Sequence, residues 1–144
     1  MRLVVGSDHG GFRLKAELLP LLRERAGLTA VDLGTHGDES VDYPDFAHAV
    51  AREILEGRAD RGLLVCGTGV GMSIAANRHK GIRAVCCSDV YSARLSRQHN
   101  DANVLCIGER VLGRGLAWEI VAAWLDEPAS PDARHVRRVG KIEI

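Results

Sequence analysis

The stretch LLVCGTGVGMSIAAN, residues 63–77, decides the fold. Its first four residues, Leu63–Cys66, form an apolar run that is typical of a buried strand. A glycine loop, Gly67–Gly71, follows, and the remaining residues predict a helix that begins near Ser73. The loop is not a P-loop, because Gly-Lys-Ser/Thr is missing, and its spacing is not the GxGxxG of a dinucleotide site. A buried strand that turns through glycines into a helix indicates a parallel α/β sheet.

The same alternation of strand and helix extends along the rest of the chain. The sequence predicts further strands at residues 3–6, 29–33, 82–87 and 104–107, each nearly continuous in apolar residues. The other segments carry apolar residues at helical spacing: Leu14, Leu18, Leu21 and Leu22; Phe46, Val50 and Ile54; Leu112, Leu116, Ile120 and Trp124. Pro20 lies in the first of these segments and is expected to bend its helix. We predict a three-layer α/β/α doubly wound sandwich with a five-stranded parallel sheet, Rossmann-like or flavodoxin-like.

Length and composition predict one globular domain over residues 1–144, because 46% of the residues are hydrophobic. The 19 Lys and Arg balance the 19 Asp and Glu, so no overall field favours nucleic acid or an anionic membrane. The apolar run at the N-terminus is too short for a signal peptide, and no segment approaches 18 uninterrupted apolar residues. We therefore expect a cytoplasmic protein without nucleic-acid or membrane partners.

The four cysteines contain no CxxC pair and no zinc-site spacing, which predicts free thiols in a reducing compartment. Cys86, Cys87 and Cys106 are expected to be small buried hydrophobes. Cys66 is different because it stands beside the glycine loop and a helix N-terminus, which favours the thiolate and makes it a candidate base or nucleophile. A cysteine that ends an apolar strand is also often a core residue, so both readings remain open.

Polar residues gather where the predicted strands end. Ligands of open α/β sheets bind outside the carboxyl ends of the strands. The residues expected at this edge are Asp8, His9, Asp42, Tyr43, Cys66, Thr68 and Asp89. The glycines allow successive N–H groups to point into one cavity, where they would bind a phosphate or an oxyanion formed during a reaction.

Two further clusters carry candidate functional residues. His99 and Asn100 fall at the end of the fourth helix, where His99 either complements the helix dipole or transfers a proton, and Asn100 fits ordinary turn chemistry. Arg110 follows the fifth strand, and the tail contains Arg134 and Arg138, four residues apart. On one helix these two would project together onto a phosphate, unless they form only a solvated face.

Four collinear segments give the chain a family resemblance: SDHGGFRLK (7–15), DLGTHGDESVDYPDFA (32–47), GLLVCGTGVGMSIAANRHKGIRAVCCSDVYSARLSRQHNDANVLCIGERVLG (62–113) and RHVRRV (134–139). Together they closely resemble the ribose-5-phosphate isomerase B family, which includes the subunits of galactose-6-phosphate isomerase. The resemblance implies an aldose-ketose isomerase that acts on sugar phosphates through a cis-enediol. It implies no metal and no organic cofactor.

The resemblance also implies roles for individual residues. Cys66 matches the proton acceptor that moves hydrogen between C1 and C2, and His99 matches the acid that opens the furanose ring. The family pattern places Asp8 and Thr68 nearby, so the catalytic positions are Cys66, His99 and Thr68. The cradle for the enediolate oxygen matches Gly67, Thr68, Gly69, Val70 and Gly71. Substrate or phosphate contacts match Asp8, His9, Tyr43, Asn100, Arg110, Arg134 and Arg138.

Some family members carry a glutamate base just after the glycine loop, where this chain has Met72. The chain therefore resembles the cysteine branch. Asn100 matches a contact from a neighbouring subunit, which implies a homodimer or homotetramer with the site at the interface. The tail, residues 127–144, is expected to pack on that neighbour.

The residues leave several functions open. The leading expectation is interconversion of ribose 5-phosphate and ribulose 5-phosphate, a step of the pentose phosphate pathway. The alternatives are isomerisation of allose 6-phosphate, galactose 6-phosphate or a tetrulose phosphate, a noncatalytic partner subunit, and a noncatalytic nucleotide- or phosphate-binding module.

Overall fold

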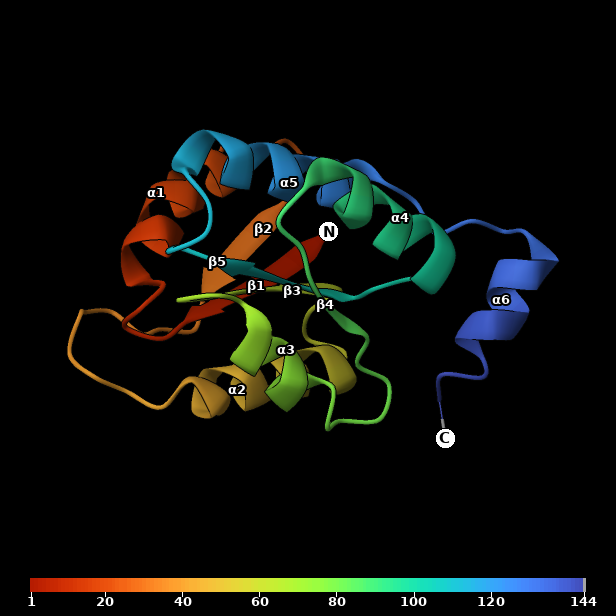
Figure 1. Ribbon diagram of the computed structural model, residues 1–144, viewed down its shortest axis with the longest axis horizontal. Helices are drawn as coiled ribbons and strands as arrows, with labels where there is room; N and C mark the ends of the chain where they lie inside the picture. Colours follow the sequence, from red (N-terminus) through yellow and green to blue (C-terminus); the bar gives the residue numbers. More distant parts are fainter. Residues whose placement is uncertain (144) are drawn as a thin grey trace.

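The computed structural model describes residues 1–143 and shows alternating strands and helices (Figure 1). The strands are β1 (Arg2–Ser7), β2 (Thr29–Asp32), β3 (Arg61–Cys66), β4 (Ala84–Cys86) and β5 (Val104–Gly108). The helices are α1 (Phe12–Arg23), α2 (Tyr43–Leu55), α3 (Val70–Ala76), α4 (Val90–Asn100), α5 (Arg114–Asp126) and α6 (Ala133–Val139).

The five strands form one parallel sheet in the order β2-β1-β3-β5-β4. This confirms the predicted parallel architecture, and the order differs from that of flavodoxin only in the exchange of the last two strands. Cys66 pairs in register with Gly108, so the end of β3 and the end of β5 lie side by side at the carboxyl edge of the sheet. The glycine loop therefore begins at the middle strand of that edge.

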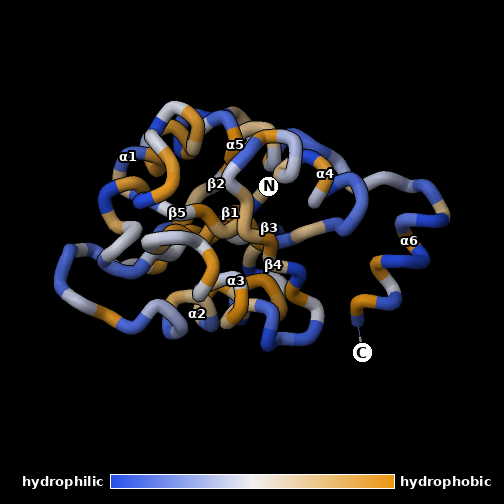
Figure 2. Tube along the Cα trace, in the orientation of Figure 1, coloured by the Kyte–Doolittle hydropathy of each residue, from blue (hydrophilic) through white to orange (hydrophobic). Residues whose placement is uncertain are grey.

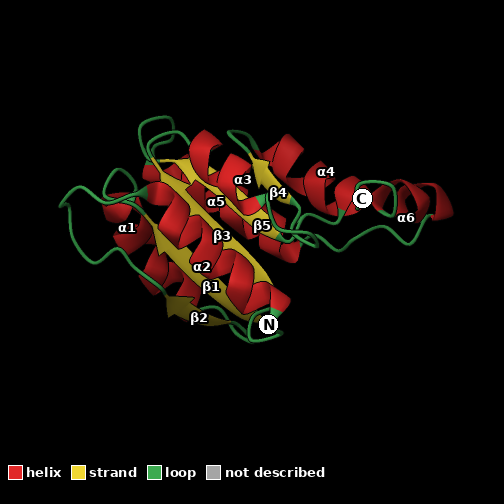
Figure 3. Cartoon of the chain, turned by 90° about the horizontal axis from the view of Figure 1, so that it is seen from below, coloured by secondary structure: helices red, strands yellow, loops and turns green. Residues whose placement is uncertain are grey.

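Helices cover both faces of the sheet (Figures 1 and 3). Alternate strand residues such as Val5 and Leu63 pack with α1, α4 and α5, whereas Val4 and Leu64 pack with α2 and α3. The hydrophobic residues accordingly concentrate in the strands and on the inner sides of the helices (Figure 2). A fully buried side chain such as Leu18 contributes about 1.5–3 kcal/mol of burial free energy.

Several element boundaries differ from the predictions. Helix α3 begins at Val70 rather than near Ser73, because Gly69 with φ +83° already turns the chain into the helix. Strand β4 contains only residues 84–86 of the predicted 82–87. Helix α5 begins after Leu112, and its Leu116 is exposed because the buried stripe lies elsewhere. That stripe is formed by Ala117, Ile120, Val121, Trp124 and Leu125.

Helix α6 stands apart from the sandwich, beyond the end of α4 (Figures 1 and 3). It contacts α4, and the segment before it is tied there because Ser130 N–H donates to the carbonyl of Gln98 over 3.1 Å. Within the described residues, 1–143, the helices are all too short or too polar to cross a membrane.

Candidate active site

One amide of the glycine loop points at the sulfur of Cys66. Gly69 N–H donates to Cys66 Sγ over 3.0 Å, and the Cys66 side chain is buried beneath the loop. This contact depends on Gly69, whose left-handed φ of +83° is one that residues with a Cβ rarely adopt. The sulfur therefore faces the glycine loop, as the candidate-base interpretation requires, although it also borders the apolar cluster beneath α3.

The loop after β1 forms a second wall of the site. Gly11 allows this close approach, because a Cβ at that position would lie 2.2 Å from the carbonyl oxygen of Val65. Asp8 is 8% exposed, and its Oδ1 has no hydrogen-bond partner within the described residues. His9 accepts a hydrogen bond at Nδ1 from Val41 N–H over 3.2 Å, which ties this wall to the loop after β2. A buried carboxylate oxygen without a partner is rare, and it indicates a place for a polar ligand group.

Arg110 lies between these two walls. Its guanidinium is 3.3 Å from the position that a Cβ of Gly67 would take and 3.6 Å from that of Gly10. A single cation thus borders both the glycine loop and the loop that contains Asp8. The negative charge of a bound anion would be stabilised at this point.

Tyr43 and Thr68 complete the group at this edge. The Tyr43 ring stands over Gly71, where a Cβ would come within 2.9 Å of the ring. Thr68 Oγ1 accepts from Val70 N–H over 3.3 Å at the start of α3. Asp89, in contrast, has a structural partner, because its carboxylate accepts from Ser92 N–H over 2.7 Å and caps α4.

Cys86 is exposed, which corrects the expectation that it is buried. The reason is that β4 is an edge strand and Cys86 is its last residue. Desolvation of its sulfur, together with nearby Cys66, raises the pKa of the Cys86 thiol. Burial raises the pKa of Cys87 to about 12. The neutral thiol is therefore the stable form of both residues near pH 7, and neither is suited to be a base.

A second group of predicted site residues lies at the end of α4. The rings of His99 and His135 are stacked, with their centroids 4.3 Å apart and 4° between their planes. Burial lowers the pKa of His135, and nearby His99 and Arg134 act in the same direction. A cavity of about 310 Å³ between α4 and α6 is lined by residues that include His99, Arg134 and His135. The sequence patterns did not identify this stacked pair, because His135 is 36 residues from His99 and its partner is set only by the fold.

Arg134 and Arg138 are both exposed on α6, which confirms that they share one helix. Arg134 Nε lies 3.1 Å from Asp132 Oδ2. With His99 and Asn100 they form what we call the α4–α6 group: His99, Asn100, Arg134, His135 and Arg138.

Within one chain, the α4–α6 group and Cys66 lie at opposite edges of the sheet. Helix α4 starts after the carboxyl end of β4 and runs back to the amino end of β5, so Asn100 lies at the amino edge of the sheet. Its 11 residues span about 16 Å. The structure thus brings together Asp8, His9, Tyr43, Cys66, Thr68 and Arg110, and it separates them from the α4–α6 group.

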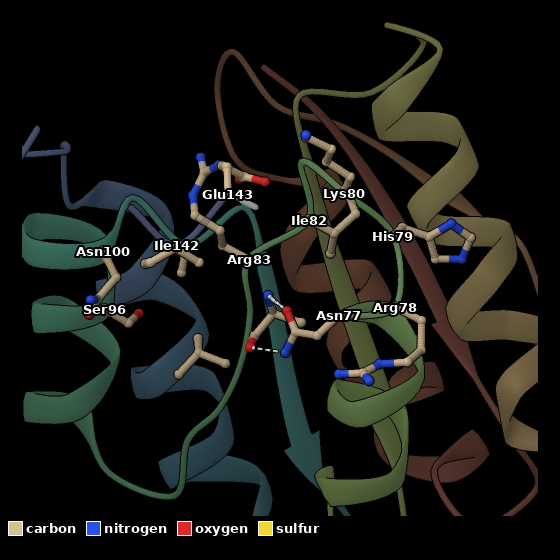
Figure 4. Close-up of a pocket in the computed structure, with 13 residues that line it drawn as sticks. Asn77, Arg78, His79, Lys80, Ile82, Arg83, Ser96, Asn100, Ile142 and Glu143 are labelled. Atoms are coloured by element: carbon tan, nitrogen blue, oxygen red, sulfur yellow. Dashed lines mark hydrogen bonds and ion pairs between the residues drawn. The ribbon is translucent and has the colours of Figure 1, made fainter. Parts of the chain in front are cut away.

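The cavity shown in Figure 4 also lies at the amino edge of the sheet and has a volume of about 490 Å³. Arg83, which lines it, pairs with Glu143 over 2.9 Å, and the Asn77 side chain bonds the backbone of Ala84. Asn100 is the one predicted site residue in its lining. Because Cys66 and the glycine loop are absent from this lining, the cavity is not the site at the carboxyl edge.

Comparison with known proteins gives consistent matches over nearly the whole chain. The family described as Ribose/Galactose Isomerase matches residues 3–142. Ribose-5-phosphate isomerase B of Escherichia coli strain K12 is 52% identical over 141 residues, which cover 98% of this chain and 93% of that protein. D-Erythrulose-4-phosphate isomerase 2 of Mycolicibacterium smegmatis is 43% identical over 144 residues, which cover 99% of this chain and 95% of that protein.

A solved structure of ribose-5-phosphate isomerase B from Clostridium thermocellum has the same fold, with a TM-score of 0.95. It is 54% identical in sequence, and the match covers 99% of this chain and 95% of that one. The matched residues 3–142 include the glycine loop, the loop after β1 and the α4–α6 group. The resemblance seen in the sequence is thus confirmed, and the chain belongs to the ribose/galactose isomerase family.

Proposed function

We propose that this chain interconverts ribose 5-phosphate and ribulose 5-phosphate through a cis-enediol, with neither a metal nor an organic cofactor. The observation that supports this most strongly is the sulfur of Cys66, which accepts a hydrogen bond from Gly69 N–H at the bottom of the glycine loop. The thiolate takes the proton from C2 of the open-chain aldose and returns it to C1, while a hydroxyl proton is lost from O2 and one is gained at O1. A well-placed base of this kind contributes roughly a hundredfold to ten-thousandfold in rate.

Removing that proton leaves a negative charge on the sugar oxygen. The N–H groups of the glycine loop are held in place before the reaction, and one well-aimed donor is worth about 3 to 4 kcal/mol to such an oxyanion. The unpaired Oδ1 of Asp8 accepts a hydrogen bond from a sugar hydroxyl, which relieves the cost of its burial. The amides of the glycine loop therefore favour the intermediate that the base produces.

We propose that the site is completed by a second copy of this chain. His99 opens the furanose ring and Asn100 contacts the substrate, yet both lie at the opposite edge of the sheet from their own Cys66. Exposed apolar side chains flank the edge strand β4: Ile74 of α3 is 59% exposed, and Tyr91 of α4 is 74% exposed. A homodimer, or a homotetramer built from such dimers, would cover them and let the tail from residue 127 onward reach the neighbouring site.

Phosphate binding is assigned to the arginines. Replacing Arg134 or Arg138 by alanine is expected to raise KM for ribose 5-phosphate about tenfold and leave kcat nearly unchanged, because a charge-assisted contact made before and during the reaction is lost. Arg137 of the same helix is exposed and provides the matched control, since Arg137→Ala should leave KM within about twofold. Steady-state kinetics with ribose 5-phosphate measure KM and kcat of the three variants. A KM unchanged in both Arg134→Ala and Arg138→Ala would place the phosphate elsewhere.

The substrate is tested with a coupled-assay panel of ribose, allose, galactose and erythrulose phosphates, compared by kcat/KM. We expect ribose 5-phosphate to give the highest value. A four-carbon substrate is the second candidate, because the M. smegmatis relative named as an erythrulose-4-phosphate isomerase is 43% identical. A noncatalytic binding module would instead bind a phosphate ligand saturably and turn over no sugar.

The compartment that we expect for the proposed sugar-phosphate isomerase is the cytoplasm.

A further inference from the structure

No side chain at the start of helix α1 caps its first N–H groups. Its N-cap residue is Gly11, no side chain of the first turn caps it, and the first turn contains no acidic residue. The first N–H groups of a helix need partners from outside the helix, and a negative charge is favoured there. The loop that contains Asp8 leads directly into this uncapped end.

Glu109, which lies far from α1 in the sequence, supplies the missing cap. Its Oε2 accepts a hydrogen bond from Leu14 N–H over 2.9 Å, across 95 positions of sequence. Leu14 is the third residue of α1, which is the position that an N-cap side chain usually bonds. Glu109 therefore fixes α1, and with it the wall formed by the loop after β1, to the turn after β5.

The backbone of the same turn holds the glycine loop. Glu109 N–H donates to the carbonyl of Cys66 over 2.9 Å, and Arg110 N–H donates to the carbonyl of Gly67 over 3.0 Å. In a planar trans peptide the N–H points opposite to the C=O. The N–H groups of Gly67 and Thr68 must therefore point away from the turn. Gly67 N indeed lies 3.4 Å from the position that a Cβ of Gly10 would take, so it lies against the loop after β1.

We propose that Glu109 is a positioning residue that fixes the distance between the Asp8 loop and the amides of the glycine loop. It touches neither the sulfur nor a substrate in this role and acts through Leu14 and Cys66. The kinetic consequence rests on the proposed function, whereas the effect on the reactivity of Cys66 does not.

Three variants test the proposal in the full-length protein. Glu109→Ala removes the acceptor, Glu109→Gln keeps an oxygen that can accept from Leu14 N–H, and Glu119→Ala on the exposed side of α5 is the matched control. Each is measured for kcat and KM with ribose 5-phosphate, and for the rate at which iodoacetamide alkylates Cys66, followed by mass spectrometry of its peptide. Circular dichroism gives the folded fraction.

Glu109→Ala is expected to lower kcat about a hundredfold, because small displacements of a site carry penalties of that size, with a much smaller change in KM. The rate of Cys66 alkylation should also change several-fold, because the buried sulfur and the Gly69 amide that contacts it are displaced. Glu109→Gln should restore both values to within a few-fold, and Glu119→Ala should change neither.

If Glu109→Ala does not fold, Glu109→Asp takes its place, since its shorter side chain keeps the charge but cannot reach Leu14 N–H. A folded Glu109→Ala or Glu109→Asp protein with normal kcat and normal Cys66 alkylation would overturn the proposal, as would a Glu109→Gln protein no better than Glu109→Ala. If the wild-type protein turns over no sugar phosphate, the proposed function fails, and the alkylation rates alone still decide the role of Glu109.

Discussion

Cys66→Ala is expected to fold normally, to bind ribose 5-phosphate and to lose at least about a hundredfold in kcat. The reason is that the sulfur beneath the glycine loop is the only group proposed to take the proton, and an alanine methyl group cannot. KM should change little, because the phosphate contacts lie elsewhere. Steady-state kinetics and equilibrium binding of ribose 5-phosphate measure the two quantities separately.

Cys86→Ala is the control for this experiment. Cys86 also ends a strand at the carboxyl edge, but its thiol pKa is raised and its side chain is exposed. The Cys86→Ala protein should retain kcat within several-fold of wild type. Near-normal turnover in Cys66→Ala, or an equal loss in the two variants, would remove Cys66 from the role of base.

Mixing two inactive variants is expected to restore activity. In a site shared between subunits, Cys66→Ala and His99→Ala damage opposite halves, so a mixed dimer contains one site with both halves intact and one with neither. Random reassortment of equal amounts should therefore recover about a quarter of the wild-type sites. The measurement is the activity of the two variants after they are unfolded together and refolded, compared with each variant refolded alone.

The control is a second mixture. It combines His99→Ala with the double variant His99→Ala, Arg134→Ala, and no mixed dimer of these two contains an intact His99. It should gain nothing on mixing. If Cys66→Ala and His99→Ala also gain nothing while forming mixed dimers, each chain must complete its own site, and the interface proposal is wrong.

The sequence predicted the sheet and the group of residues at its carboxyl edge because both depend on local patterns. Apolar runs identified the strands, and the glycines after Cys66 indicated a loop whose backbone approaches the sulfur, as the bond from Gly69 N–H shows. The predictions were wrong where the burial of a residue depends on its position in the folded sheet. Cys86 is exposed because β4 lies at the edge, and strand order cannot be read from one sequence.

The same limit explains two other differences. Leu116 shares its helical spacing with Ile120, but the packing of α5 on the sheet buries Ala117 and Val121 instead. Glu109 gave no sequence signal of its own, since its partner Leu14 is 95 residues away and the bond exists only in the folded chain. Contacts between distant residues are set by the order of the strands, which local periodicity does not specify.

Deuterium exchange tests the role of the Cys66 thiolate most directly. Ribose 5-phosphate is incubated in D₂O with wild-type protein or with Cys66→Ala, and proton NMR follows the loss of the hydrogen at C2. The wild type should replace that hydrogen with deuterium as it isomerises the sugar, while Cys66→Ala should bind the sugar and leave the hydrogen in place. Exchange at the wild-type rate in Cys66→Ala would show that another group takes the proton and would contradict the account.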